Sequence, residues 1–161
     1  MAQFPLRDVA ASLVGKLAQK YSRSTTALKP RLARTCLKNL LDSSKPFGSH
    51  YGSLMGLYAI GGSEVVRDLI LPNVKSYEIM IKDEIVDDGP RKAEAEKVLG
   101  AILKLLASLT DDQAPLMNGH PAEAEEEIRK RLVDVVGDLV GSRIAETGQL
   151  QLAKAIIDSP L

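Results

Sequence analysis

Tryptophan is absent from this sequence, all aromatic residues together make up only 4% of it, and it contains one cysteine and two histidines. With so few rings, aliphatic side chains must fill the core, which favours packed helices over a sheet sandwich. The lone Cys36 cannot close an internal disulfide. Two histidines are too few for an ordinary zinc site, which takes three or four His, Cys or carboxylate ligands at short spacing. We therefore expect neither a disulfide scaffold nor a bound metal.

The short motifs of common enzyme families are missing as well. No G-x-S-x-G, G-x-x-x-x-G-K-[ST] or G-x-G-x-x-G occurs, so nothing indicates a nucleophile elbow, a P-loop or a dinucleotide site. The acids between Asp83 and Asp88 would place Ile85 at a calcium-ligand position, which excludes a calcium loop. We interpret His50 and Cys36 as packing residues and His120 as a solvated one. The sequence thus predicts no enzyme and no cofactor.

No apolar run approaches the ~20 residues that a membrane-spanning helix needs, so we expect no membrane segment. The composition is that of a globular protein, with 45% hydrophobic and 26% charged residues in 161, and the length suits one domain over 1–161. The net charge is zero, but residues 1–60 hold nine basic and two acidic side chains, a net charge of +7 that the remainder balances. Such asymmetry bears on partners rather than on fold.

Apolar residues recur at helical spacing along most of the chain. The first expected helix covers 5–21, and its apolar stripe is Leu6, Val9, Ala10, Leu13, Val14 and Leu17. A second, capped from the cluster at 22–26, ends near Asp42, and a third ends at Gly61 and Gly62. A fourth must kink or break at Pro72. A fifth reaches about Leu109, a loop follows over 110–120, a sixth runs from Pro121 to about Gly148, and a short last helix contains 150–157.

No segment alternates apolar and polar residues as a half-buried strand would, so we predict an all-α fold. Consecutive helix pairs would begin near Leu6, His50 and Arg91, a spacing close to the ~40 to 47 residues of HEAT and armadillo repeats. This favours a HEAT-like superhelical stack of antiparallel helix hairpins, with a closed helical bundle as the alternative. Gly52 and Gly56 share one helix face and predict close helix packing there; Gly137 and Gly141 repeat that spacing.

Basic residues form two ridges on the first two helices. On each helix they recur at spacings that place them on one face, and the two sets could form one patch. A solvated surface is the simplest interpretation, while contact with nucleic acid phosphates or with an acidic protein segment is the alternative. The candidate interaction surface consists of Lys16, Lys20, Arg23, Arg31, Arg34 and Lys38.

Four strings, in this order and spacing, carry a resemblance to a known family: LRDVAASLVGKLAQKYS, LKPRLARTCLKNLLD, KPFGSHYGSLMGLYAIGG and VVRDLILPNVKSYE. They resemble the C-terminal HEAT-repeat domain of TBP-associated factor 6, a subunit of the general transcription factor TFIID. The likeness is strongest from Leu6 to about Glu78, and RTCLK and AIGG look most like fungal members. The family's characteristic positions where helices pack or turn correspond here to Tyr51, Gly52, Gly56, Leu57, Leu71 and Pro72.

The resemblance implies a non-enzymatic nuclear scaffold that binds other subunits of TFIID and, in fungi, of the SAGA coactivator. It also implies that the chain is one domain of a longer protein whose N-terminal histone fold pairs with TBP-associated factor 9. It supplies no catalytic, cofactor or metal residues. Weak, salt-dependent contact of the basic ridges with promoter DNA is the alternative function.

Overall fold

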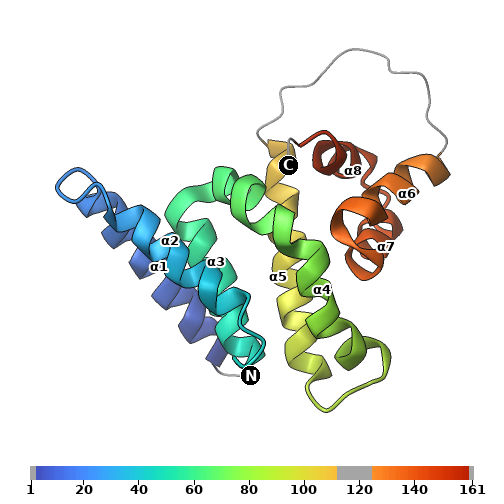
Figure 1. Cartoon of the computed structure of the whole chain (residues 1–161), viewed down its shortest axis with the longest axis horizontal. Helices are drawn as coiled ribbons and strands as arrows, with labels where there is room; N and C mark the ends of the chain where they lie inside the picture. The colour runs from blue at the N-terminus through green and yellow to red at the C-terminus, as the bar shows by residue number, and fades with distance from the viewer. Residues whose placement is uncertain (1–2, 112–124, 160–161) are drawn as a thin grey trace.

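The computed structural model describes residues 3–111 and 125–159, and every regular element within these ranges is helical (Figure 1). This confirms the all-α prediction. The elements are α1 (Gln3–Tyr21), α2 (Leu28–Leu40), α3 (Phe47–Val65), the π-helical turn η1 (Val66–Ile70), α4 (Leu71–Val86), α5 (Lys92–Asp111), α6 (Glu125–Val136), α7 (Asp138–Glu146) and α8 (Leu150–Ile157). None of the described helices is long and apolar enough to cross a bilayer. The loop expected over 110–120 falls largely outside the described residues, as do His120 and Pro121.

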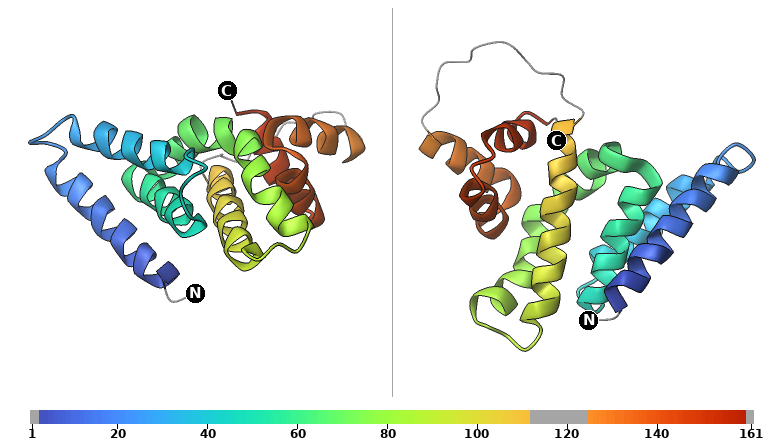
Figure 2. Two further views of the ribbon diagram at one scale, coloured as in Figure 1. Left: turned by 60° about the horizontal axis from the view of Figure 1, so that its bottom comes forward. Right: turned by 180° about the vertical axis from the view of Figure 1, so that it is seen from behind.

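The helices stack in two layers, as Figure 2 shows in its left view. Helices α1, α3 and α5 lie side by side in one layer, and α2 and α4 cover them from the other. The hairpins are out of step with the predicted pairing, because α1 touches α2 little, whereas α2 packs closely on α3. The hairpins of consecutive helices are α2 with α3 and α4 with α5, and α1 packs on α3 at one end of the stack. Helices α6, α7 and α8 close the other end against α4 and α5.

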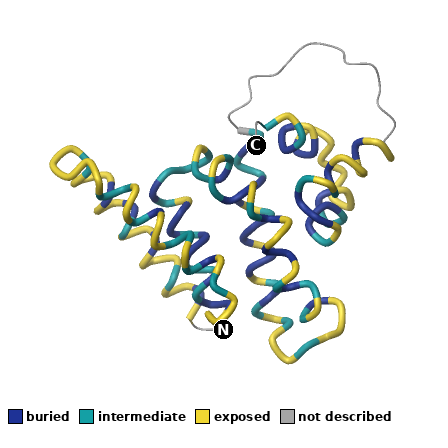
Figure 3. Tube along the Cα trace, in the orientation of Figure 1, coloured by how far each residue is buried: buried dark blue, intermediate teal, exposed yellow. Residues whose placement is uncertain are grey.

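Helix α1 turns the opposite face to the core from the one that its apolar stripe predicts. Its buried residues are Phe4, Ala11, Gly15 and Ala18, whereas Leu6 is 71% exposed, Val9 66%, Leu13 57% and Leu17 47% (Figure 3). The reason is the closeness of α3: a Cβ on Gly15 would lie 2.6 Å from the carbonyl oxygen of Ala59. Small residues allow this approach, and leucines in their place would hold the two helices apart.

Helix α2 begins at Leu28 after Ala27, which provides no side-chain cap, so the expected cap from the Ser and Thr residues at 22–26 is wrong. Thr25 instead donates its backbone N–H to the carbonyl of Tyr21 and accepts one from Leu28, and these turns lead the chain from α1 into α2. Pro30 lies in the first turn of α2, where its missing N–H has no helical partner to lose, as predicted.

Between α3 and α4 the chain bends twice. At Gly62 the backbone has φ 60° and ψ −146°, a conformation open to glycine alone, so the helix predicted to end there is interrupted inside α3. Then η1 widens the helix by one residue, and Leu71 donates its N–H to the carbonyl of Val66, five residues back. Pro72 therefore enters in the first turn of α4, where its ring is tolerated, and Asn73 donates its side-chain amide to the carbonyl of Leu69 at 2.8 Å. The expected kink or break at Pro72 is this π-helical turn.

The helix predicted from Pro121 to Gly148 consists of two helices in its described part. Gly137 has φ 92° and separates α6 from α7, while Gly148, with φ 65°, ends α7 as expected. The predicted apolar side is largely correct for both helices: Ile128, Leu132, Val136 and Ile144 are buried. The apolar periodicity continues across Gly137 and so conceals the break.

The core runs through the stack and is centred on α5. Along it, Val98, Leu99, Ile102, Leu106 and Leu109 are buried, which confirms the predicted stripe. The stripe of α4 packs against it through Val74, Tyr77 and Ile81, and α8 adds Leu152 and Ile156. In the described ranges the buried core cluster contains one phenylalanine and one tyrosine among aliphatic residues, in keeping with the scarcity of aromatic residues; the partly buried residues packed against it include Cys36, Tyr51, Met55 and Met80.

Candidate interaction surface

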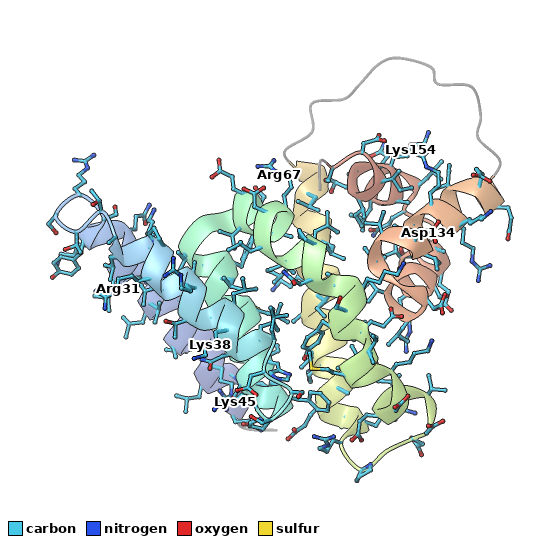
Figure 4. The ribbon with its side chains drawn as sticks, viewed as in Figure 1. Arg31, Lys38, Lys45, Arg67, Asp134 and Lys154 are labelled. Carbon is cyan, nitrogen blue, oxygen red and sulfur yellow. The ribbon has the colours of Figure 1, made fainter. Side chains whose placement is uncertain are left out.

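The six basic residues of the candidate surface extend into solvent from the free end of the stack. Lys16 and Lys20 are exposed on α1, Arg23 lies in the turn that follows it, and Arg31, Arg34 and Lys38 are exposed on α2. Figure 4 shows Arg31, Lys38 and Lys45 following one another along α2 and the loop after it. No described carboxylate lies within ion-pair distance of the six side chains. Since α1 and α2 both pack on α3 and touch each other little, the action of the two sets as one patch stays a prediction.

Next to these cations lies an exposed apolar row on α1, formed by Leu6, Val9, Leu13 and Leu17. On a helix of about 100° per residue, Lys16 and Lys20 fall within about 60° of Leu13, so the two lysines border this row and do not lie opposite it. The Nζ atom of Lys20 also lies 5.3 Å from the centroid of the Tyr21 ring, which is itself 45% exposed. This end of the molecule therefore presents exposed aliphatic side chains beside uncompensated positive charge.

Tyr51 ties α1 to α3 near the amino-terminal end of α1. Its hydroxyl donates to Asp8 Oδ1 at 2.8 Å, and its ring meets that of Phe4 edge-on, with the centroids 5.0 Å apart. Desolvation, with a smaller contribution from the Asp8 carboxylate, raises the pKa of Tyr51 to about 12. Tyr51 thus stays a neutral donor. Asp8, the one acid of α1, points toward α3 and not toward Lys16 and Lys20.

The remaining predicted packing residues lie along α3 and at the start of α4. At Gly52 and Gly56 an added Cβ would meet side-chain atoms of Arg7 at 3.4 Å and of Cys36 at 3.2 Å, whereas the close backbone approach occurs at Gly15. Leu57 and Leu71 are fully buried, and Pro72 is exposed. Burial raises the pKa of the Cys36 thiol, which keeps it protonated and unreactive at neutral pH.

His50 is buried and joins two elements that sequence reasoning did not connect. Its Nε2 lies 2.9 Å from the carbonyl oxygen of Asp42 and its Nδ1 lies 2.8 Å from the Tyr77 hydroxyl. Because a carbonyl can only accept, Nε2 carries the proton and Nδ1 accepts from Tyr77. Burial raises the pKa of Tyr77, which keeps the hydroxyl a donor. With both nitrogens engaged, His50 is a structural link between the loop after α2 and α4, consistent with its interpretation as a packing residue.

A second buried link holds the carboxyl-terminal helices. Glu78 on α4 is 5% exposed, and its Oε2 accepts the backbone N–H of Val140 at 3.0 Å, in the first turn of α7. Its negative charge thus lies at the positive end of that helix. At the rim, Lys75 donates to the carbonyl of Asp134 at 2.8 Å and Lys82 lies 3.4 Å from Asp138. No sequence motif indicates Glu78; a glutamate on the predicted core face of a helix is the only signal.

The side of the stack between α3 and α5 carries an open groove of about 430 Å³. Tyr51 and Met55 form one wall and Lys97, Gly100 and Lys104 the other. It continues past Lys104 into a second hollow near Tyr58 and the start of α8. Within the described residues no three His, Cys, Asp or Glu side chains gather as metal ligands.

Comparison with known proteins places this architecture in a family. Residues 1–75 match the TAF6 C-terminal HEAT repeat domain. The chain is 33% identical to the SAGA complex/transcription factor TFIID complex subunit Taf6 of Schizosaccharomyces pombe over 156 residues. This alignment covers 96% of this chain and 33% of that protein. It is 38% identical over 103 residues to transcription initiation factor TFIID subunit 6 of Arabidopsis thaliana, covering 62% of this chain and 19% of that protein.

The chain is also 32% identical over 102 residues to the TAF6-like RNA polymerase II p300/CBP-associated factor-associated factor 65 kDa subunit 6L of Mus musculus, covering 61% of this chain and 16% of that protein. The chain thus spans a third or less of the length of these relatives. No solved structure gives a significant match. Through residues 1–75 and the helical stack that they begin, the chain belongs to the family of TAF6 C-terminal HEAT repeat domains.

Proposed function

We propose that this chain is a non-enzymatic, protein-binding scaffold of the transcription initiation machinery, acting in the nucleus within TFIID and SAGA. The observation that carries the proposal is the match over 96% of the chain to a relative that is a subunit of both complexes. The stacked helices support it, because a rigid stack offers long surfaces to partner segments and loses little conformational freedom on binding. The chain works through contacts with other subunits and needs no cofactor.

The test is capture from a fission-yeast nuclear extract with the tagged full chain as bait. We expect TFIID or SAGA subunits to be enriched over a bait of equal size and charge. Crosslinking mass spectrometry of the captured material then assigns the contacting surfaces. Recovery of no subunit of either complex, from a bait shown to be folded by circular dichroism, would contradict the proposal.

A second candidate function is contact with promoter DNA through the six basic residues of α1, α2 and their connecting turn. It is favoured by the exposure of these cations and by the lack of any described carboxylate at ion-pair distance. Such binding releases counterions and weakens steeply with salt. The test compares duplex DNA binding by the full chain, by Arg31→Glu/Arg34→Glu and by the control Lys97→Glu/Lys104→Glu on α5. Affinity that is indifferent to salt, or equally reduced in both variants, would exclude this function.

A further inference from the structure

Helix α1 is apolar on two opposite faces, and only one of them is covered. The buried face packs on α3 through Phe4, Ala11, Gly15 and Ala18. The other face carries Leu6, Val9, Leu13 and Leu17 at the spacing i, i+3, i+7 and i+11, which makes one continuous row. We call this row the α1 ridge. A solvated helix keeps its polar side toward water, so a row of four exposed aliphatic residues marks a face that another element can cover.

The position of α1 in the stack shows on which side of it a further helix would pack. Helix α3 has α1 on one flank, α5 on the other and α2 above it, and so is covered on each apolar side. Helix α1 is the outermost member of the same layer and has no hairpin partner among the described helices, since α2 pairs with α3. The α1 ridge has the apolar character of an internal layer, so the interface between α1 and α3 is of a kind that can be continued outward by one more helix.

Charge specifies the chemistry of that helix. Lys16 and Lys20 border the ridge, Arg23 follows it, and Asp8 is turned away toward Tyr51. An occupant with aliphatic residues along its centre and carboxylates along its edges would bury the ridge and neutralise the border. A second copy of the chain would bring no carboxylate for these lysines from its own α1, because Asp8, the one acid of that helix, is bonded to Tyr51. From these observations, and on the basis of the scaffold function proposed above, we infer that the α1 ridge is the docking site for an amphipathic helix of another polypeptide with an aliphatic stripe bordered by Asp and Glu.

The experiment uses two synthetic helical peptides with leucine at i, i+3, i+7 and i+11, one bordered by glutamate and the other by lysine. Binding to the full chain is measured by fluorescence anisotropy. We expect the glutamate-bordered peptide to bind more tightly, and Leu13→Ser to weaken it by about tenfold or more, as a central interface residue does. The matched control is Ile79→Ser, because Ile79 is 72% exposed on α4, away from the ridge. Lys16→Glu/Lys20→Glu should reverse the preference between the two peptides.

Since Leu13 is exposed, its replacement should leave the melting temperature unchanged, so that lost binding is not lost folding. Equal binding of the two peptides, or an equal loss in Ile79→Ser, would overturn the inference. So would a dimer in analytical ultracentrifugation that Leu13→Ser converts to a monomer, because the occupant would then be a second copy. The scaffold function is tested separately. If the ridge binds the peptide but the bait captures no TFIID or SAGA subunit, only the scaffold function is contradicted. If the bait captures subunits but peptide binding does not depend on the ridge, only this inference is contradicted.

Discussion

At Gly15 the backbones of α1 and α3 come too close together to leave room for a side chain. Any side chain there must displace the carbonyl oxygen of Ala59, which belongs to the backbone of α3 and cannot rotate away. We expect Gly15→Ala to lower the free energy of unfolding by ~1 to 3 kcal/mol, measured by urea denaturation, despite the better helix propensity of alanine. The control is Gly100→Ala, where nothing lies within 4 Å of the new Cβ and the change should stabilise the helix by up to about 1 kcal/mol.

The buried pair of His50 and Tyr77 gives a second prediction at this scale. Tyr77→Phe removes the hydroxyl that donates to His50 Nδ1 and leaves that nitrogen without a partner in the core. Stranding a buried acceptor costs about 1 to 3 kcal/mol of unfolding free energy. Tyr58→Phe is the control, because Tyr58 is 36% exposed and water can replace its partners. Equal melting temperatures for Tyr77→Phe and the unaltered chain would contradict the link.

Glu84 supplies a pH-dependent prediction for the turn between α4 and α5. Its carboxylate accepts from Arg91 Nε at 2.8 Å and from the Arg91 backbone at 3.2 Å, and these bonds hold the pKa of Glu84 below its ordinary value of 4.5. A lowered pKa stabilises the fold above the ordinary value, and this contribution is lost as the pH falls through the folded-state pKa. Glu84→Gln should therefore melt earlier than the unaltered chain at pH 7, with the difference vanishing in acid. Glu64→Gln, at an exposed position, is the control for the loss of one surface carboxylate.

At the scale of elements, Glu78 and Gly137 join α4 to the carboxyl-terminal helices. Glu78→Gln keeps the size of the side chain but removes the negative charge from the amino-terminal end of α7. We expect faster hydrogen exchange in α7 and α8, by the equivalent of about 1 kcal/mol, with α1 to α3 unaffected. Gly137→Ala should do more, because its Cβ would fall 2.5 Å from the Glu78 carboxyl group and φ is 92° there. Uniform loss of protection in both variants would mean that the helices do not open separately.

Elements were predictable from the sequence where a helix has one apolar stripe and buries it, as α4, α5 and α8 do. The α1 prediction was wrong because periodicity shows that a stripe exists, not which of two apolar faces is covered; the choice was made by Gly15 and Ala18 against α3. The division of α6 from α7 was missed because it depends on Gly137 and a glutamate 59 positions away, which no local pattern connects. The six basic residues are exposed, and their spacing identifies the helix faces that carry them but not the chemistry of any molecule that binds there.

At the scale of the whole molecule, the order of the layers decides which fragments fold. Helix α5 covers the flank of α3 opposite α1, so a fragment of residues 1–75 leaves buried leucines such as Leu54 and Leu57 without their neighbours. We expect residues 1–75 to show no cooperative urea transition by circular dichroism, and residues 1–111 to show one. A sharp transition for the shorter fragment would mean that the family-matched segment is a folding unit by itself.

The widened turn at Val66–Ile70 also determines where this segment can change in length. It takes up one extra residue just before Pro72 within a single π-helical turn, so the residues after it keep the faces that an uninterrupted α-helix would give them. A single deletion within the turn would let it close to ordinary α-helix and leave Val74, Tyr77 and Ile81 on the core. A deletion after Pro72 would instead turn these three residues by about 100°. A change of length is therefore better tolerated in this turn than in α4, whereas substitution in the turn is restricted by the burial of Val66 and Ile70.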